Sequence, residues 1–184
     1  MNNSLNKYPV KIGDSSEGLN FYFVSKGKSA VIKVVNCGFV AKIRGEDIYN
    51  FGFGDFDMHS HRIVDSVVTE NGDAIKVFNT VLSTVPLFFE RFPNDKLIVK
   101  GSDSRAGFEN DCKPTCRKNC KLDQCRKANQ RIRIYRNYVD KNFEILNTEY
   151  RFFGGYTDFH GNDCEEDYVR GKDYISVSLV KRNV

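Results

Sequence analysis

The spacing of the apolar residues changes at Asn71-Gly72-Asp73, and this change limits the folds that the chain can adopt. Before that point, short runs of β-branched and aromatic residues are separated by turn residues, which is typical of strands. After it, apolar residues recur every three or four positions, which is typical of an amphipathic helix. Asp73 stands where a helix cap is expected. The pattern therefore predicts strands followed by a helix that packs on them.

Four strands are expected before the change of spacing. Residues 20–45 are broken at Lys26-Gly27-Lys28, which predicts a hairpin, with a bulge near Gly38. Residues 48–54 and 62–68 predict a third and a fourth strand. Strands that follow one another this closely favour an antiparallel meander.

Two helices and two more strands are expected afterwards. The first helix covers about residues 74–92, with a kink or a split at Pro86, because proline lacks the backbone donor. The second helix covers about residues 127–143, and residues 97–99 and 174–180 predict strands. We therefore expect an α+β fold, with a mostly antiparallel sheet in the order β-β-β-β-α-β-α-β and two helices packed on one face.

Length and composition fit one globular domain over residues 1–184, of which 40% are hydrophobic and 13% aromatic. The first residues lack the charged-then-apolar order of a signal peptide, and no apolar run approaches the ~20 residues that span a bilayer. We expect a soluble, cytoplasmic protein without a membrane partner. In a reducing cytosol, clustered cysteines are more often free thiols or metal ligands than disulfides.

Residues 112–125 read CKPTCRKNCKLDQC, which places four of the six cysteines close together. Four thiolates are the number that a closed tetrahedral zinc site needs. However, the spacing is C-x₃-C-x₃-C-x₄-C, and on a straight helix the first and third cysteines stand ~12 Å apart. A zinc site therefore requires a turn near Pro114, and free thiols or disulfides are the alternatives. The candidate metal ligands are Cys112, Cys116, Cys120 and Cys125.

Positive charge is concentrated between Cys112 and Arg136. This stretch carries +8 and the rest of the chain −4, within a net charge of +4. A field this concentrated attracts polyanions by steering and counterion release, although a solvated basic surface is the alternative. The candidate anion-binding or nucleic-acid-binding residues are Ser102, Arg105, Lys113, Arg117, Lys118, Lys121, Arg126, Lys127, Arg131, Arg133, Tyr135 and Arg136.

Two other short segments, residues 101–105 and residues 55–61, each have a binding interpretation and a structural one. Gly101 to Arg105 follow a predicted strand, where backbone N–H groups can hold a phosphate, with Ser102 and the arginines of the second helix converging on it. Otherwise the segment turns the chain and the arginines face water. Asp55, Asp57, His59 and His61 alternate in the sequence and can bind a divalent metal or form a polar turn.

Several segments together resemble a family of small uncharacterised bacterial proteins known only as a domain of unknown function. They are Tyr49–Asp57, Asn71–Val77, Gly101-Ser102, Arg131–Arg136 and Gly171–Tyr174. The resemblance implies the fold and no activity. In that family the Gly-Ser turn runs almost directly into the Arg-x-Arg-x-Tyr-Arg stretch. The resemblance therefore implies that residues at about 103–130, including the cysteines, are a basic insertion.

Three functions fit these observations. The first is a soluble binding module whose basic helix and loop contact nucleic acid or an acidic partner. The second is a small ribonuclease-like or phosphate-ester enzyme, such as a toxin-type component, that uses Tyr135 and the arginines. The third is a structural or partner-binding protein without nucleic-acid contact. The sequence contains neither G-x-S-x-G nor H-E-x-x-H, so hydrolases and metalloproteases with these motifs are excluded.

Overall fold

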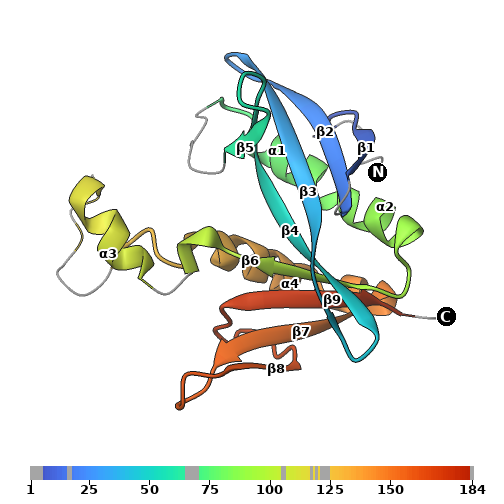
Figure 1. The fold of residues 1–184 in the computed structure, drawn as a ribbon, viewed down its shortest axis with the longest axis vertical. Helices are drawn as coiled ribbons and strands as arrows, with labels where there is room; N and C mark the ends of the chain where they lie inside the picture. Colours follow the sequence, from blue (N-terminus) through green and yellow to red (C-terminus); the bar gives the residue numbers. More distant parts are fainter. Residues whose placement is uncertain are drawn as a thin grey trace. The chain divides into compact units, whose positions relative to one another are not determined.

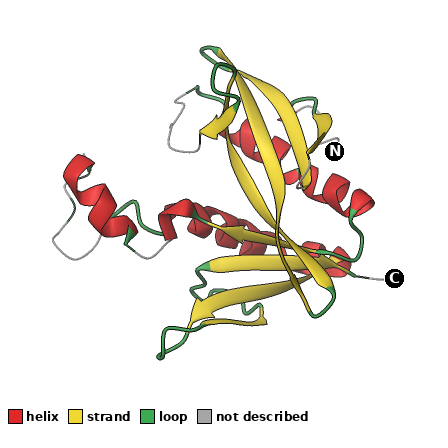
Figure 2. Cartoon of the chain, in the orientation of Figure 1, coloured by secondary structure: helices red, strands yellow, loops and turns green. Residues whose placement is uncertain are grey.

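The chain forms two compact units, Met1–Asp95 and Lys96–Val184, in a computed structural model. The α+β class and the mostly antiparallel strands are confirmed (Figure 2). The expectation of a single domain with an insertion stays a prediction. None of the helices that the structure describes is long and apolar enough to span a bilayer. The structure describes residues 6–15, 18–64, 71–104, 107–116, 118, 120 and 125–182.

The first unit contains antiparallel strands in the order β1-β2-β3-β4, with β5 beside β4 (Figure 1). The predicted hairpin, third strand and start of the fourth strand are confirmed, while residues 65–68 lie outside the described part of the chain. β1 was not expected, because its sequence KIGDS holds a single large apolar residue. The strands are β1 (Lys11–Ser15), β2 (Gly18–Lys26), β3 (Ala30–Ile43), β4 (Glu46–Asp57) and β5 (Arg62–Val64).

The bulge expected near Gly38 lies at Val40. The register of β3 against β4 passes from Phe39 opposite Tyr49 to Ala41 opposite Ile48, so β3 has one extra residue. An extra residue changes which face the following side chains occupy.

The first helical segment is split in two, as the proline predicted. α1 (Ala74–Leu82) and α2 (Thr84–Arg91) are separated at Ser83, three positions before Pro86. The break falls there because a proline ring in a continuous helix collides with the carbonyl four residues earlier, which is that of Leu82. The Ser83 and Thr84 hydroxyls donate to carbonyls of the preceding turn, at 2.8 and 2.7 Å.

Aromatic side chains join α2 to the strands of its unit. Phe88 and Phe89 are buried, and the Phe88 ring lies 5.3 Å from the Tyr49 ring of β4. Phe92 also packs on Tyr49, with 4.8 Å between ring centroids. This contact between large apolar surfaces is part of the core of the first unit, which also contains Phe21, Val34 and Val35.

A buried polar network connects the residues before β1, the end of β2 and the start of α1. Asp73 occupies the N-cap position, as expected, but its side chain makes no cap hydrogen bond. Its Oδ2 instead accepts hydrogen bonds from the Tyr8 and Ser25 hydroxyls, at 2.7 and 2.6 Å. Asn71 Nδ2 donates to Ser25 Oγ at 2.7 Å. Burial opposes the ionisation of Asp73, but the two hydroxyl donors outweigh it and lower its pKa.

The second unit contains four antiparallel strands in the order β6-β9-β7-β8 and the long helix α4 (Gln130–Glu149) (Figure 1). α4 packs against β6, β7 and β9. The predicted order lacked β7 and β8, and α4 begins later and ends later than expected. α4 starts after Asn129, which adopts a left-handed conformation with φ of 56°. The strands are β6 (Lys96–Lys100), β7 (Tyr150–Thr157), β8 (Asp163–Asp167) and β9 (Ser176–Lys181).

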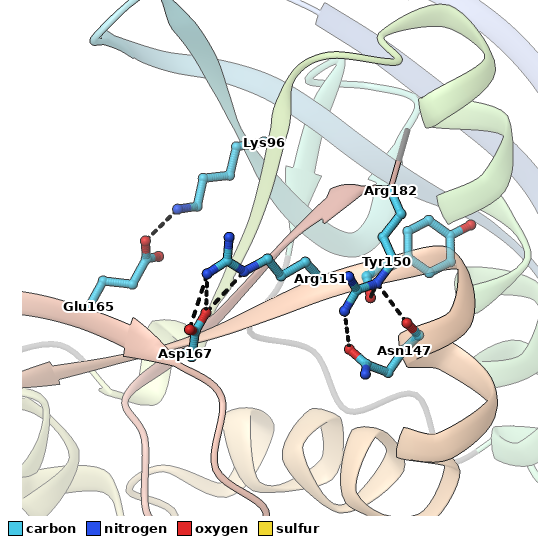
Figure 3. A network of polar contacts seen from close by, with 7 residues as sticks. All are labelled: Lys96, Asn147, Tyr150, Arg151, Glu165, Asp167 and Arg182. Carbon is cyan, nitrogen blue, oxygen red and sulfur yellow. Dashed lines mark hydrogen bonds and ion pairs between the residues drawn. The ribbon is translucent and has the colours of Figure 1, made fainter. Parts of the chain in front are cut away.

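Figure 3 shows polar contacts that join the edge strand β8 to β7 and β6, and Arg182 to the end of α4. Arg151 donates to Asp167 through Nε and Nη2, and Lys96 pairs with Glu165. These exposed pairs each contribute little to stability. Arg182 donates through Nε to the carbonyls of Asn147 and Tyr150, at 2.7 and 3.2 Å, and so satisfies acceptors that α4 leaves open at its end.

We predict that Asp73→Asn lowers the free energy of unfolding by about 1–2 kcal/mol at pH 7, because two charge-assisted hydrogen bonds become neutral. The pKa of Asp73 is lower in the folded protein than in the unfolded chain, where it is near 3.9. Its contribution to the free energy of unfolding is therefore fully present above pH ~3.9 and is lost as the pH falls through the folded pKa. Urea unfolding followed by circular dichroism between about pH 5 and pH 3 checks this.

The stability of Asp73→Asn should fall less than that of the parent protein as the pH is lowered. Asp14→Asn, at an exposed position, should show the same pH dependence as the parent protein. Equal stability of Asp73→Asn and the parent at pH 7 would contradict the role of the network.

Candidate metal centre

The cysteine-rich segment bends at the place where a metal site requires it. After β6 the chain passes through η2 (Ser102–Ser104), α3 (Phe108–Cys112) and η3 (Lys113–Thr115). Pro114 lies in the first turn of η3, and the chain leaves that turn with Cys116 in an extended conformation. The cysteines therefore do not follow one straight helix.

This bend brings the four cysteines together. Two Sγ–Sγ distances, from Cys112 to Cys125 and from Cys116 to Cys120, are both 3.6 Å. The sulfurs of Cys112, Cys116 and Cys125 all lie within 4.8 Å of one another, and Cys120 also interacts with Cys125. All of these cysteines are free.

The sulfur spacing is compatible with zinc. A Zn–S bond of about 2.3 Å in a regular tetrahedron places the sulfurs about 3.8 Å apart. The two 3.6 Å pairs differ from this by a few tenths of an ångström, and the sulfurs of Cys112, Cys116 and Cys125 form the group that is mutually close, with Cys120 beside Cys116. Cys112, Cys116, Cys120 and Cys125 are thus the residues that can hold a metal.

Backbone and carboxylate contacts hold the ligands in place. Arg126 N–H donates to Cys120 Sγ at 3.3 Å. Cys125 N–H donates to Glu109 Oε1 at 3.1 Å, which joins α3 to the last cysteine. Such contacts around a metal site orient the ligands and stabilise thiolate charge.

The thiols differ in acidity. Burial, with hydrogen bonds to Cys125 and Cys116, raises the pKa of Cys112 to about 11. A hydrogen bond from the Lys118 backbone, followed by one from Cys120, lowers the pKa of Cys116. Cys116 is therefore the first of these two thiols to ionise, and a metal has to displace the proton from Cys112.

The predicted basic residues that the structure describes differ in exposure. Lys113, Lys118, Arg126 and Arg133 are exposed, and Lys127, Arg131, Tyr135 and Arg136 are half-buried. Arg105, Arg117 and Lys121 lie outside the described residues. In the part of the chain that the structure describes, no acidic side chain forms an ion pair with any of the four exposed cations.

The structure brings Ser102 and Arg131 together, but it does not bring the three predicted arginines to one point. Arg131 Nη1 donates to Ser102 Oγ at 2.8 Å. Arg136 instead pairs with Asp173 at 2.5 Å and donates to the Tyr174 carbonyl at 3.1 Å. Arg133 points to solvent from α4. Arg136 therefore fastens the chain before β9.

The two other predicted groups are Tyr135 and the segment from Asp55 to His61. Burial raises the pKa of Tyr135 to about 12, and its role in catalysis or binding stays a prediction. Asp57 accepts hydrogen bonds from His59 N–H and Ser60 Oγ at 2.9 and 2.7 Å, which is a polar turn. Asp55 pairs with Lys33.

Sequence reasoning missed the role of Asp103. Its Oδ2 accepts a hydrogen bond from Arg131 N–H at 2.9 Å, and its carbonyl accepts one from Asn129 N–H at 3.0 Å. It thereby caps α4 from 28 residues away. The sequence signal was only an aspartate in a loop, which is too common to identify a remote cap.

The chain matches the model of a family of unknown function, DUF6934, over residues 4–106. It belongs to this family. The match to DUF6934 covers the first three segments of the resemblance, while Arg131–Arg136 and Gly171–Tyr174 lie beyond it. No curated protein and no solved structure matches the chain. The four cysteines also lie outside the residues matched to DUF6934.

We predict that the protein, purified without chelators, contains close to one zinc ion per chain. Cys116→Ser should remove most of this zinc, because three thiolates and water bind it less tightly than four thiolates. Elemental analysis measures the metal, and cobalt substitution reports tetrahedral thiolate ligation by absorption.

Cys164→Ser is the matched control, because Cys164 lies in β8 outside the cluster and should leave the zinc content unchanged. Metal-free protein with four reactive loop thiols would rule out the zinc site.

Proposed function

We propose that residues 107–136 form a zinc-organised module that binds nucleic acid through its phosphates. The observation that carries this proposal is the gathering of the sulfurs of Cys112, Cys116 and Cys125 within 4.8 Å of one another, with Cys120 beside Cys116, in a segment whose exposed cations form no ion pair with any acidic residue that the structure describes. The zinc gives the segment its shape, and the cations supply the affinity.

The segment needs a metal because it has almost no apolar core. Among the described residues of 107–129, Cys112 alone is buried. Short segments that bury so little surface are held by metals or disulfides in other proteins. Since the cysteines are free, a metal is the remaining device.

The charge of the segment stays strongly positive after zinc binds. Four thiolates and one Zn²⁺ contribute −2, so the +8 between Cys112 and Arg136 becomes +6. Part of that charge is internal to the fold, since Arg136 pairs with Asp173. The exposed Lys113, Lys118, Arg126 and Arg133 are the groups available to a partner.

We favour nucleic acid over an acidic protein because the exposed cations are spread along the chain from η3 into α4. A phosphate backbone presents regularly spaced charges and releases bound counterions when cations contact it. An acidic protein partner is the second candidate, and competition by a nucleic acid separates the two.

We predict that the protein binds a single-stranded RNA oligonucleotide with an affinity that falls steeply as salt rises. Replacing Lys118, Arg126 and Arg133 by alanine should weaken binding at least tenfold at low salt. It should also reduce the slope of log affinity against log salt by about 2, since each contact contributes about 0.7. Fluorescence anisotropy at several salt concentrations measures both.

The control replaces Lys11, Lys28 and Lys181, which are exposed outside this segment and change the net charge equally. If both triple variants lose affinity to the same extent, only net charge matters and the module is not the binding surface. Cys116→Ser should weaken binding as well, because the segment loses the shape that positions its cations.

A further inference from the structure

The four cysteine sulfurs form two close pairs that differ in exposure. Cys116 Sγ lies 3.6 Å from Cys120 Sγ, and Cys112 Sγ lies 3.6 Å from Cys125 Sγ. Cys112 is buried, with 8% of its surface exposed, whereas Cys116 and Cys120 are both partly exposed. A small reagent in solution therefore reaches both members of the Cys116–Cys120 pair more readily than both members of the other pair.

Cys120 lies at the edge of the cluster. The sulfurs of Cys112, Cys116 and Cys125 are all within 4.8 Å of one another, and Cys120 does not belong to this group of three. Its sulfur accepts a hydrogen bond from Arg126 N–H at 3.3 Å, in a contact at the surface. A bond between Cys116 and Cys120 would therefore join the outlying sulfur to one member of the group and leave the Cys112–Cys125 pair as it is.

A small movement separates the Cys116–Cys120 pair from a disulfide. A disulfide bond is about 2.05 Å long, so the two sulfurs have to approach each other by roughly 1.5 Å. Cys116 follows η3 in an extended conformation, so the two cysteines are not fixed on one continuous helix. Rotation of the side chains and adjustment of the loop between them can bring the sulfurs together.

The surroundings of the pair favour the reactive form of a thiol. The thiolate is the form that attacks an oxidant, and nearby cations and N–H donors stabilise it. The exposed Lys118 lies between the two cysteines in the sequence, and the Arg126 N–H contacts Cys120 Sγ. The pair thus combines exposure, a close second sulfur and positive charge, which are the features of a redox-sensitive dithiol.

We propose that Cys116 and Cys120 form a redox switch, which a hydroperoxide closes into a disulfide and a thiol reductant reopens. Closing the switch removes two of the four thiolates from the proposed zinc site. The remaining Cys112 and Cys125 hold zinc less tightly, so the metal is released and the segment loses its shape. The inference rests on the proposed function for what the switch controls, which is the binding of nucleic acid.

The reaction balances with hydrogen peroxide as the oxidant. The Cys116 thiolate attacks one peroxide oxygen, the O–O bond breaks, and the hydroxide that leaves takes up a proton to become water. The Cys120 thiolate then attacks the sulfur of the resulting Cys116 sulfenic acid, the S–S bond forms, and the second hydroxide leaves and is protonated. Each sulfur loses one electron and each peroxide oxygen gains one.

The disulfide is suited to being reopened. It closes only the short loop of residues 116–120, and a disulfide across a short loop stabilises a chain less than one across a long loop. Two molecules of a thiol reductant restore the two thiols by exchange and are themselves joined by a disulfide. The switch is therefore reversible without further chemistry.

Two double variants test which pair reacts. Cys112→Ser/Cys125→Ser retains Cys116 and Cys120, whereas Cys116→Ser/Cys120→Ser retains the other pair. Each lacks two of the four candidate ligands, so both are compared without metal and differ in the retained pair alone. Disulfide formation with hydrogen peroxide should be roughly tenfold faster in the first variant, because both of its thiols are accessible. Thiol titration measures the rate, and mass spectrometry maps the bond.

The zinc-loaded parent protein tests the consequence. Hydrogen peroxide should form the Cys116–Cys120 disulfide, release zinc to a chromogenic indicator and lower the affinity for a single-stranded RNA oligonucleotide roughly tenfold at low salt. Dithiothreitol with added zinc should restore the affinity. Cys164→Ser is the matched control, because Cys164 lies in β8 outside the cluster and should leave the response unchanged.

Equal rates in the two double variants, or a Cys112–Cys125 disulfide as the main product in the parent protein, overturn the inference. It also fails if the Cys116–Cys120 disulfide forms without releasing zinc. If the reduced protein binds RNA but peroxide does not form this disulfide, the inference fails and the proposed function stands. If the disulfide forms and zinc is released but the reduced protein does not bind RNA, the switch stands and the proposed function fails.

Discussion

Asp103 holds together the two ends of the cysteine-rich segment, and the candidate site depends on this contact. Its carbonyl accepts from Asn129 N–H and its carboxylate accepts from Arg131 N–H. The chain therefore enters and leaves the cysteine-rich segment at nearly the same point. The start of α4 is held by this closure. One carboxylate oxygen of Asp103 accepts from Arg131 N–H, and the other is buried next to Gly101.

Between these ends, sulfur replaces the hydrophobic core as the organising element. Cys112 is the one buried residue among those described from 107 to 129, and its sulfur lies 3.6 Å from that of Cys125. Apolar packing holds the first unit through rings such as Phe88 and Tyr49. The first unit therefore depends on the hydrophobic effect, whereas the proposed zinc site would make the segment depend on metal supply and on the redox state of its thiols.

Local signals in the sequence predicted much of the fold. Pro86 splits the helix because its effect reaches only four residues back, and the change of spacing at residue 71 separates strands from helices. β7 and β8 were missed, since Gly154 and Gly155 interrupt the alternation of the first and charged residues fill the second. The four cysteines were found as candidates, but their proximity depends on a bend whose direction the sequence does not encode locally. The part played by Asp103 was not predictable, because its contact with Arg131 spans 28 residues.

The closure at Asp103 also makes the segment separable from the fold that carries it. Its ends are already one hydrogen bond apart, so a tight turn can replace everything between them without moving β6 or α4. Gaining or losing such a loop costs little free energy, because closing a long loop is only slightly less favourable than closing a short one. The cysteine cluster and the cations beside it can thus be exchanged together on an unchanged scaffold, and related chains with the same strands need not share the same ligand.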